Sequence, residues 1–245
     1  MAGLVTPAIV NVMMTTAGVA SGAAAAMTWA VRAPSCTWLA PSHHRGVRTR
    51  RAIALTFDDG PSESTPALFD LLAKHDVRAT FFQCGANVRR LPEVARRAVA
   101  NGHSIGNHTV THPRLSLRSA EFIYSEMAEA QRIIADATGC EPRWFRPPYG
   151  VRWFGLRSAQ KRLRLTSVLW STIGKDWKWP TEAIARRLMA GAMNGAIFCL
   201  HDGRTLQARP DIDNTLEAVA QVIPVLRDQG FHFETVDEIL CPTTT

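Results

Sequence analysis

The feature that most constrains the fold is a regular alternation of short apolar segments with longer amphipathic ones between residues 52 and 236. Strand-like apolar segments lie at 52–57, 77–82, 104–105, 144–145, 165–170, 196–200 and 231–236. Helical patterns lie between them at 65–74, 92–101, 118–137, 154–162, 181–190 and 213–229. Roughly seven or eight alternating units predict an α/β protein with a parallel sheet, open or closed into a barrel. A single domain is the simplest reading of 245 residues with 46% apolar content.

The first predicted strand ends at two adjacent carboxylates. Its apolar residues stop at Asp58 and Asp59, and Gly60-Pro61 then predicts a turn. Folds of this class place their chemistry at the carboxyl ends of strands. Neighbouring strand residues point to opposite faces, so we expect the aspartates to divide their tasks, one handling protons and the other a metal. An Asp-Asp-Gly segment alone is more often an ordinary solvated turn. The residues at the other strand ends therefore decide between a turn and a functional site.

A pair of histidines follows the third predicted strand. His108 and His112 lie four residues apart, a spacing that lets both imidazoles reach one divalent ion at about 2.0–2.1 Å. Asp59 supplies the carboxylate that a catalytic site with two histidines and open positions would use. The alternative is two surface histidines in a turn before Pro113.

Three further strand ends carry polar residues. Arg146 begins the segment Arg-Pro-Pro-Tyr-Gly, where an arginine can orient a carboxylate and a rigid turn can aim an N–H at a developing oxyanion. Asp176 and His201 follow the later strands. Any one of these endings could be a structural turn, but their repetition favours one shared cleft.

These segments resemble the five ordered motifs of nodulation-type polysaccharide deacetylases, carbohydrate esterase family four, over about residues 51–237. The matching segments are 56–61, 108–112, 146–150, 176–177 and 200–202. The resemblance implies a single-domain distorted (β/α) barrel of seven or eight strands, with the catalytic domain at 51–240. It also implies metal-dependent hydrolysis of acetyl groups, most often N-acetyl groups on amino sugars of a polymer such as chitin or peptidoglycan.

The resemblance assigns catalytic roles to four residues. Asp58 would be the general base, oriented by Arg146. His201 would be the general acid, with Asp176 stabilising its protonated form. Many members of the family carry more acids before the fourth motif, whereas residues 171–175 of this chain carry none.

The resemblance also assigns the metal ligands and the substrate pocket. One divalent ion, zinc first and cobalt or nickel as substitutes, would bind Asp59, His108 and His112. The backbone N–H of Tyr149 would contact the oxyanion, and Trp177 and Leu200 would line the pocket for the acetate methyl. Outside these motifs, Trp153 is the tryptophan that we expect as an exposed platform for sugar rings.

Two alternatives remain open from the sequence. One is an amidase or deacetylase that acts on a small or lipid-linked N-acyl compound, because the chemistry of the acetyl group is the same whatever lies beyond it. The other is a relative that binds glycans with weak activity. The complete set of five motifs argues against the second, since a binding module needs neither Asp58 nor His201.

Charge and cysteine usage exclude several classes. The net charge is +7, but five arginines and no acid precede residue 58, and the remaining 23 basic and 21 acidic residues leave a charge of only +2. We therefore expect an acetylated carbohydrate and no nucleic acid as partner. The five cysteines are scattered without a C-x-x-C pair, so neither a disulfide framework nor a thiolate zinc site is expected. We expect Cys84 and Cys199 to be buried and inert.

Residues 1–50 lie outside the resemblance. Residues 1–31 carry no charged side chain, and this segment is long enough for a membrane span or an export signal. Arginines follow this segment rather than precede it, an arrangement that would keep the downstream domain in the cytoplasm. We favour a membrane-associated or secreted protein, with a cytoplasmic one as the alternative. The sequence does not indicate an oligomeric state.

Overall fold

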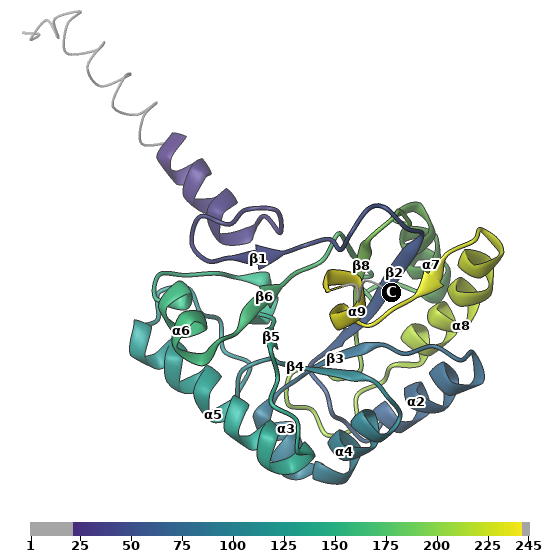
Figure 1. The fold of residues 1–245 in the computed structure, drawn as a ribbon, viewed down its shortest axis with the longest axis horizontal. Coiled ribbons are helices and arrows are strands. Elements are labelled where there is room, and N and C mark those ends of the chain that lie inside the picture. The colour runs from purple at the N-terminus through teal and green to yellow at the C-terminus, as the bar shows by residue number, and fades with distance from the viewer. Residues whose placement is uncertain (1–21, 242–245) are drawn as a thin grey trace, which may run out of the picture.

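The computed structural model describes residues 22–241, which form a nine-stranded, wholly parallel sheet surrounded by helices (Figure 1). The sheet order is β1-β6-β5-β4-β3-β2-β8-β7, with β9 paired to β2. The strands are β1 (Ser42–His43), β2 (Ala52–Asp58), β3 (Thr80–Gln83), β4 (Ser104–Asn107), β5 (Trp144–Phe145), β6 (Thr166–Val168), β7 (Thr172–Ile173), β8 (Ala196–His201) and β9 (His232–Phe233). The predicted α/β class with a parallel sheet is confirmed.

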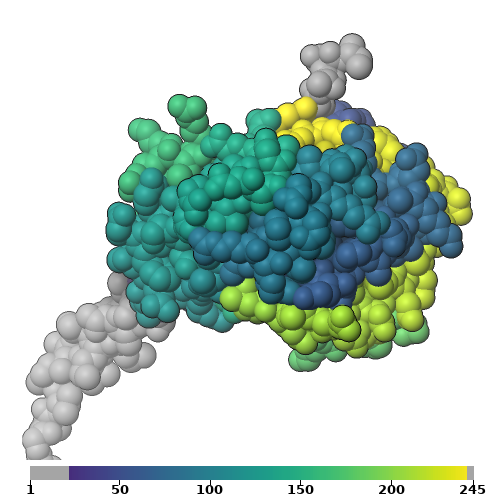
Figure 2. All heavy atoms as spheres, turned by 90° about the horizontal axis from the view of Figure 1, so that it is seen from below, coloured from purple at the N-terminus to yellow at the C-terminus, as the bar shows by residue number. Residues whose placement is uncertain are grey.

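The helices follow the strands along the chain, and most of them cover the outside of the sheet. They are α2 (Thr65–Lys74), α3 (Gly85–Arg90), α4 (Pro92–Ala100), α5 (Ala120–Thr138), α6 (Leu156–Leu163), α7 (Thr181–Ala190), α8 (Asp213–Asp228) and α9 (Val236–Leu240), with a 3-10 turn η1 at Pro148–Gly150. Seen from below, blue and teal helices of the first half of the chain and yellow-green segments of the last third form one continuous surface (Figure 2).

The sheet closes into a distorted barrel through the segment 166–173. Its first part, β6, pairs with β5, and its last part, β7, pairs with β8. Between them the chain turns inward, and the N–H of Ser171 donates to Ile197 O at 2.9 Å. The strand predicted at 165–170 is thus the shorter strand β6, and β7, which was not predicted, follows it with a different neighbour. This bend is the distortion of the barrel, and β1 fills the adjacent gap by pairing with β6.

Strand β2 explains how the barrel is filled. Its outward residues, Ile53, Leu55 and Phe57, belong to a large core between the sheet and the helices. Its inward residues include Ala52 and Ala54, which pack in a small interior cluster closed by Val236 and Ile239 of α9. Small residues suit the narrow interior, and α9 seals one end of it. The opposite end, where Asp58 lies, remains polar.

Two short helices depart from the predicted pattern. Helix α3 at 85–90 was not expected, because six residues that include a glycine and an asparagine give only a weak helical signal. The strand predicted at 231–236 is only two residues long, and α9 follows it. Thr235 caps α9 by accepting the N–H of Glu238, while the Glu238 carboxylate accepts the N–H of Thr235.

The N-terminal part of the described chain packs against the barrel. Residues 22–32 are helical, and the buried side chain of Arg152 donates to Ala33 O and Cys36 O just after them. The division at residue 50 stays a prediction, although β1 before it belongs to the same sheet. The predicted apolar leader at 1–31 lies mostly outside the described residues. Within 22–241, no helix is both long and apolar enough to cross a membrane.

Candidate active site

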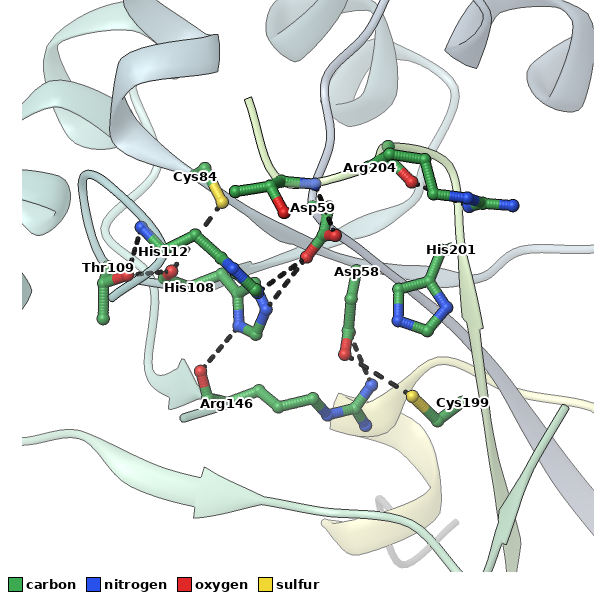
Figure 3. Close-up of polar contacts among 12 residues, drawn as sticks. Asp58, Asp59, Cys84, His108, Thr109, His112, Arg146, Cys199, His201 and Arg204 are labelled. Carbon is green, nitrogen blue, oxygen red and sulfur yellow. Dashed lines mark hydrogen bonds and ion pairs between the residues drawn. The ribbon is translucent and has the colours of Figure 1, made fainter. Parts of the chain in front are cut away.

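A cleft of about 380 Å³ opens at the carboxyl ends of the central strands. The aspartates and histidines of the cleft come from β2, β4 and β8 and from the loops that follow them (Figure 3). The segments after β5 and between β6 and the start of α7 supply the rest of its wall. The lining residues are Asp58, Asp59, His108, His112, Tyr149, Trp170, Ile173, Trp177, Cys199, His201, Arg204 and Thr205. Most of the residues that the sequence singled out therefore meet in one place.

Asp58 is held in one orientation by Arg146. The Arg146 guanidinium, which is fully buried, donates to Asp58 Oδ1 at 2.7 Å. It also donates to Val168 O at 2.8 Å and Leu169 O at 3.0 Å, so its position is fixed by the barrel wall. The guanidinium therefore fixes the orientation of the Asp58 carboxylate and places a positive charge beside it. This placement agrees with the prediction that Arg146 orients Asp58.

A sharp turn brings both aspartates into the cleft. Asp59 has φ of 73°, a left-handed conformation that is uncommon for a residue with a side chain. The chain approaches other segments too closely for side chains at two glycines. A Cβ at Gly60 would lie 2.1 Å from Asp202 Oδ2, and one at Gly203 would lie 2.4 Å from Asp59 O. The change of direction at Asp59 lets both neighbouring aspartates face the cleft, which two successive residues of an ideal strand cannot do.

Asp59, His108 and His112 converge as the sequence predicts. Asp59 Oδ1 lies 3.3 Å from His108 Nε2 and 3.0 Å from His112 Nε2, and all three residues are buried. Two ligand atoms about 2.1 Å from one ion at a tetrahedral angle are about 3.4 Å apart. The observed spacing is close to that value.

The protonation of His108 indicates that a cation belongs between these atoms. His108 Nδ1 lies 2.7 Å from Arg146 O, and because a carbonyl can only accept, this nitrogen carries the proton. In the neutral ring, Nε2 is then a lone pair that faces the Asp59 carboxylate, an arrangement that a metal ion would satisfy. Asp59 Oδ1 is buried and accepts no hydrogen bond within the described residues, which leaves it as a further ligand atom for a cation. The residues thus fit a metal ion.

His201 faces the cleft and is paired with Asp176. Its Nδ1 lies 2.8 Å from Asp176 Oδ1, and its backbone N–H donates to Asp176 Oδ2 at 2.8 Å. Thr215 Oγ1 also donates to this carboxylate at 2.8 Å. Burial alone would lower the pKa of His201, but the charge and hydrogen bond of Asp176 outweigh it and raise the pKa to about 9. The imidazole is therefore protonated at neutral pH, as a general acid requires.

Two aromatic rings stand at the mouth of the cleft. Tyr149, in the 3-10 turn, is 54% exposed, and its ring lies 4.7 Å from that of His112. Trp177 is 48% exposed and packs edge-on against His201 at 5.0 Å between ring centroids. Both lie where the sequence placed them. The role of the Tyr149 backbone N–H in binding an oxyanion stays a prediction.

Leu200 does not line the cleft, so this part of the predicted pocket is wrong. The side chain of Leu200 is fully buried in the core between the sheet and the helices. Because His201 points inward, the alternation of β8 directs Leu200 outward and Cys199 inward. Cys199 lines the cleft instead, with its thiol 3.4 Å from Asp58 Oδ2. Burial raises the pKa of this thiol, so it acts as a weak donor.

The predicted sugar platform is also misplaced. Trp153 is partly buried against a second hydrophobic core, while the neighbouring Phe154 is 56% exposed. The two rings pack edge-on, with Trp153 against the core and Phe154 toward solvent. Trp170, Ile173, Arg204 and Thr205 line the cleft but were not singled out from the sequence. Only proximity to motif residues could have indicated them.

Backbone strain concentrates at this cleft. Nine described residues other than glycine have positive φ, and six of them line the cleft or lie next to it. Such conformations cost of order 1–3 kcal/mol each and cluster at functional sites. The six are Asp59, Thr109, His112, Tyr149, Lys175 and Thr205.

The fold and the site define a parallel β/α barrel with a two-histidine, one-aspartate metal site beside a base and an acid. A family model described as polysaccharide deacetylase matches residues 45–168. The chain therefore belongs to the polysaccharide deacetylase family, as the sequence motifs indicated.

Several known proteins are similar to this chain. The peptidoglycan-N-acetylglucosamine deacetylase PgdA of Listeria monocytogenes is 37% identical over 78% of this chain and 39% of its own length. A chitooligosaccharide deacetylase of Bradyrhizobium is 36% identical over 77% of this chain and 90% of its own length. Among solved structures, BA3943, a pseudoenzyme of carbohydrate esterase family four from Bacillus anthracis, aligns with a TM-score of 0.74 and 28% identity, covering 81% of this chain and 68% of that one. The chain thus spans about two fifths of the Listeria protein.

Proposed function

We propose that this protein is a metal-dependent deacetylase that hydrolyses N-acetyl groups on amino sugars of a polysaccharide or oligosaccharide. The observation that carries the proposal is one cleft that holds a carboxylate oriented by a buried arginine, Asp58, and a protonated imidazole, His201, beside a metal-ligand set. The deacetylase names of the two curated relatives support the same chemistry.

The chain's own residues would act on the two ends of the amide bond. A metal ion held by Asp59, His108 and His112 would polarise the acetyl carbonyl and the attacking water. Asp58 takes a proton from the water as its oxygen bonds to the acetyl carbon. His201 gives its proton to the sugar nitrogen as the carbon–nitrogen bond breaks. The products are acetate and a free amine.

Metal content tests the ligand set directly. We propose zinc as the ion, with cobalt or nickel as substitutes, because nitrogen and oxygen ligands do not select sharply among these metals. His108→Ala should purify with little bound metal, while His232→Ala, a change of an exposed histidine, should keep it. Metal in His108→Ala at the wild-type level would contradict this assignment.

A pseudoenzyme among the structural relatives makes glycan binding without turnover the main competing function. The presence of Asp58 and His201 together with all three metal ligands favours catalysis. Acetate release from chitin oligomers, peptidoglycan fragments, acetyl-xylan and small N-acetyl compounds, with and without a chelator, separates the two functions. Release only from a small N-acyl compound would instead support the amidase alternative.

We also propose that residues 1–31 associate the protein with a membrane or direct its export. In the described part of this segment, residues 22–29 are exposed and uncharged, and the exposed rings of Trp29 and Trp38 pack edge-on beside them. Exposed apolar helices and tryptophans are typical of membrane interfaces. Fractionation of cells that express the full chain or an Ala24→Arg/Ala26→Arg variant tests this: soluble cytoplasmic protein in both cases would contradict it.

A further inference from the structure

We propose that the rim of the cleft recognises carboxylate groups, so the preferred substrate is an amino-sugar polymer with carboxylates next to the acetylated sugar. Peptidoglycan strands have this chemistry, whereas chitin-type chains are neutral. The inference rests on the proposed deacetylase function and concerns the same cleft.

The rim consists of the loops 108–119, 146–155, 174–180 and 202–212, which follow strands β4, β5, β7 and β8. The exposed acid on these four loops is Asp211, because Asp176 and Asp202 are buried. On the loop after β2, Glu63 is also exposed, and it pairs with Arg90. Six basic side chains on these loops are exposed or half-buried. We call them the basic rim: Arg114, Arg118, Lys175, Lys178, Arg204 and Arg209.

No residue of the basic rim forms an ion pair within the described range 22–241. Elsewhere on the surface arginines do pair with acids, as Arg89 does with Glu129 and Arg97 with Asp70. Arg114 instead stacks 4.8 Å from the ring centroid of Tyr149. Arg204 donates only to backbone oxygens, including Gly203 O at 2.8 Å. The cations of the rim are thus available to an anionic ligand.

The two arginines nearest the chemistry lie on opposite sides of the cleft. Arg204 follows β8 and lies on the side of His201 (Figure 3). Arg114 follows β4, and its guanidinium covers the ring of Tyr149. The order β4-β3-β2-β8 separates these strand ends by three spacings, about 14 Å in total. A polymer whose acetylated sugar sits over the metal ligands would therefore pass one arginine on each side.

Arginine is suited to carboxylates because its planar fork donates two parallel hydrogen bonds to them. A neutral polymer would offer only hydroxyl groups to these cations, and it would cover their charge without neutralising it. Carboxylates on the neighbouring sugars or their substituents would remove the repulsion among the six cations. The rim therefore favours an anionic glycan over a neutral one.

Three matched substrates test the inference. They are acetylated glycan strands with free carboxylates, the same strands with those carboxylates converted to amides, and neutral chitin oligomers of equal length. We expect kcat/KM to be highest for the free carboxylates, about 10-fold or more at low salt, and the preference to shrink as salt screens the charges.

Variants locate the effect on the rim. Arg204→Gln and Arg114→Gln should each reduce the preference for carboxylated over amidated strands by about 5- to 20-fold, mainly through KM. Arg186→Gln changes an exposed arginine on α7 that does not line the cleft, so it should leave the preference intact. Thermal unfolding of each variant confirms that it is folded.

The outcomes separate this inference from the proposed function. Acetate release from all three substrates without a preference, or a preference that the arginine variants keep, would overturn the basic rim and leave the deacetylase function standing. No release from any acetylated glycan would overturn the proposed function itself. A stronger preference for phosphate-bearing than for carboxylate-bearing glycans would replace carboxylate by phosphate as the recognised group and overturn the inference as stated.

Discussion

Two histidines behave in opposite ways in two regions of this protein. His103 lies in the core outside the sheet, with ring centroids 5.4 Å from Phe69 and 5.1 Å from Phe81, and burial lowers its pKa to about 4. His201 lies inside the barrel, and there Asp176 overcomes the effect of burial and raises the pKa to about 9. Burial alone makes a histidine neutral; a buried carboxylate partner makes it a cation.

The core outside the sheet and the interior of the barrel also differ in how many polar groups they hold. Outside the sheet, apolar side chains from strands and helices fill the space, and the one polar contact of the His103 ring is the backbone N–H of Ala79, which donates to Nδ1 at 3.2 Å. Inside the barrel, charged groups are buried together, and they pair as Asp58 with Arg146 and Asp176 with His201. Changes outside should therefore alter stability, and changes inside should alter activity.

The largest effect is expected from Asp58→Asn. The near-isosteric amide cannot accept a proton, so activity should fall about 10²- to 10⁴-fold. Metal content and the free energy of unfolding should stay close to the wild type. Acetate release, metal analysis and urea unfolding measure the three quantities; turnover near the wild-type rate would refute the role of Asp58 as base.

Leu200→Ala should have the converse effect. Because Leu200 is fully buried in the outer core, its truncation should cost about 2–5 kcal/mol of unfolding free energy. The KM for an acetylated substrate should be unchanged at a temperature where the variant is folded. Leu206→Ala, on an exposed loop, is the control. A raised KM with full stability would show that Leu200 lines the substrate pocket.

The variant His103→Gln tests whether His103 makes the stability of the protein depend on pH. The folded pKa of about 4 lies below the ordinary value of 6.5, so the unfolded chain binds a proton first and stability falls as pH decreases between these values. The loss is on the order of 3 kcal/mol for wild type and should be absent in the variant. Urea unfolding of both proteins with chelator, between about pH 8 and pH 4, measures the difference. Parallel curves would show that His103 does not titrate in this way.

Asp176→Asn tests the other histidine. With Asp176 in place, His201 keeps its proton up to about pH 9, so the high-pH limb of activity should lie there. Without the carboxylate, that limb should move toward the ordinary histidine value near 6.5, and the peak rate should fall by roughly 10-fold. Asp213→Asn, an exposed acid on α8, is the control. An unchanged high-pH limb with metal content intact would show that Asp176 does not tune His201.

The class of fold and the chemical centre follow from the amino-acid sequence alone. Alternating apolar and amphipathic segments predict the parallel sheet, because each strand needs a helix to return the chain in the same direction. Each motif ends a strand, so Asp59, His108 and His112 had to meet at the carboxyl edge of the sheet. These inferences need only local pattern and the geometry of parallel strands.

Which side chains face the cleft, and how their charges balance, depends on contacts between distant parts of the chain. The left-handed turn at Asp59, which turns two neighbouring aspartates to one side, depends on contacts with the distant residues Asp202 and Gly203. Whether Leu200 or Cys199 lines the cleft depends on the register of β8, because a shift of one residue moves every side chain to the opposite face. The proton on His201 and the unpaired rim arginines likewise depend on which carboxylates lie nearby. Such long-range contacts leave no local pattern in the sequence.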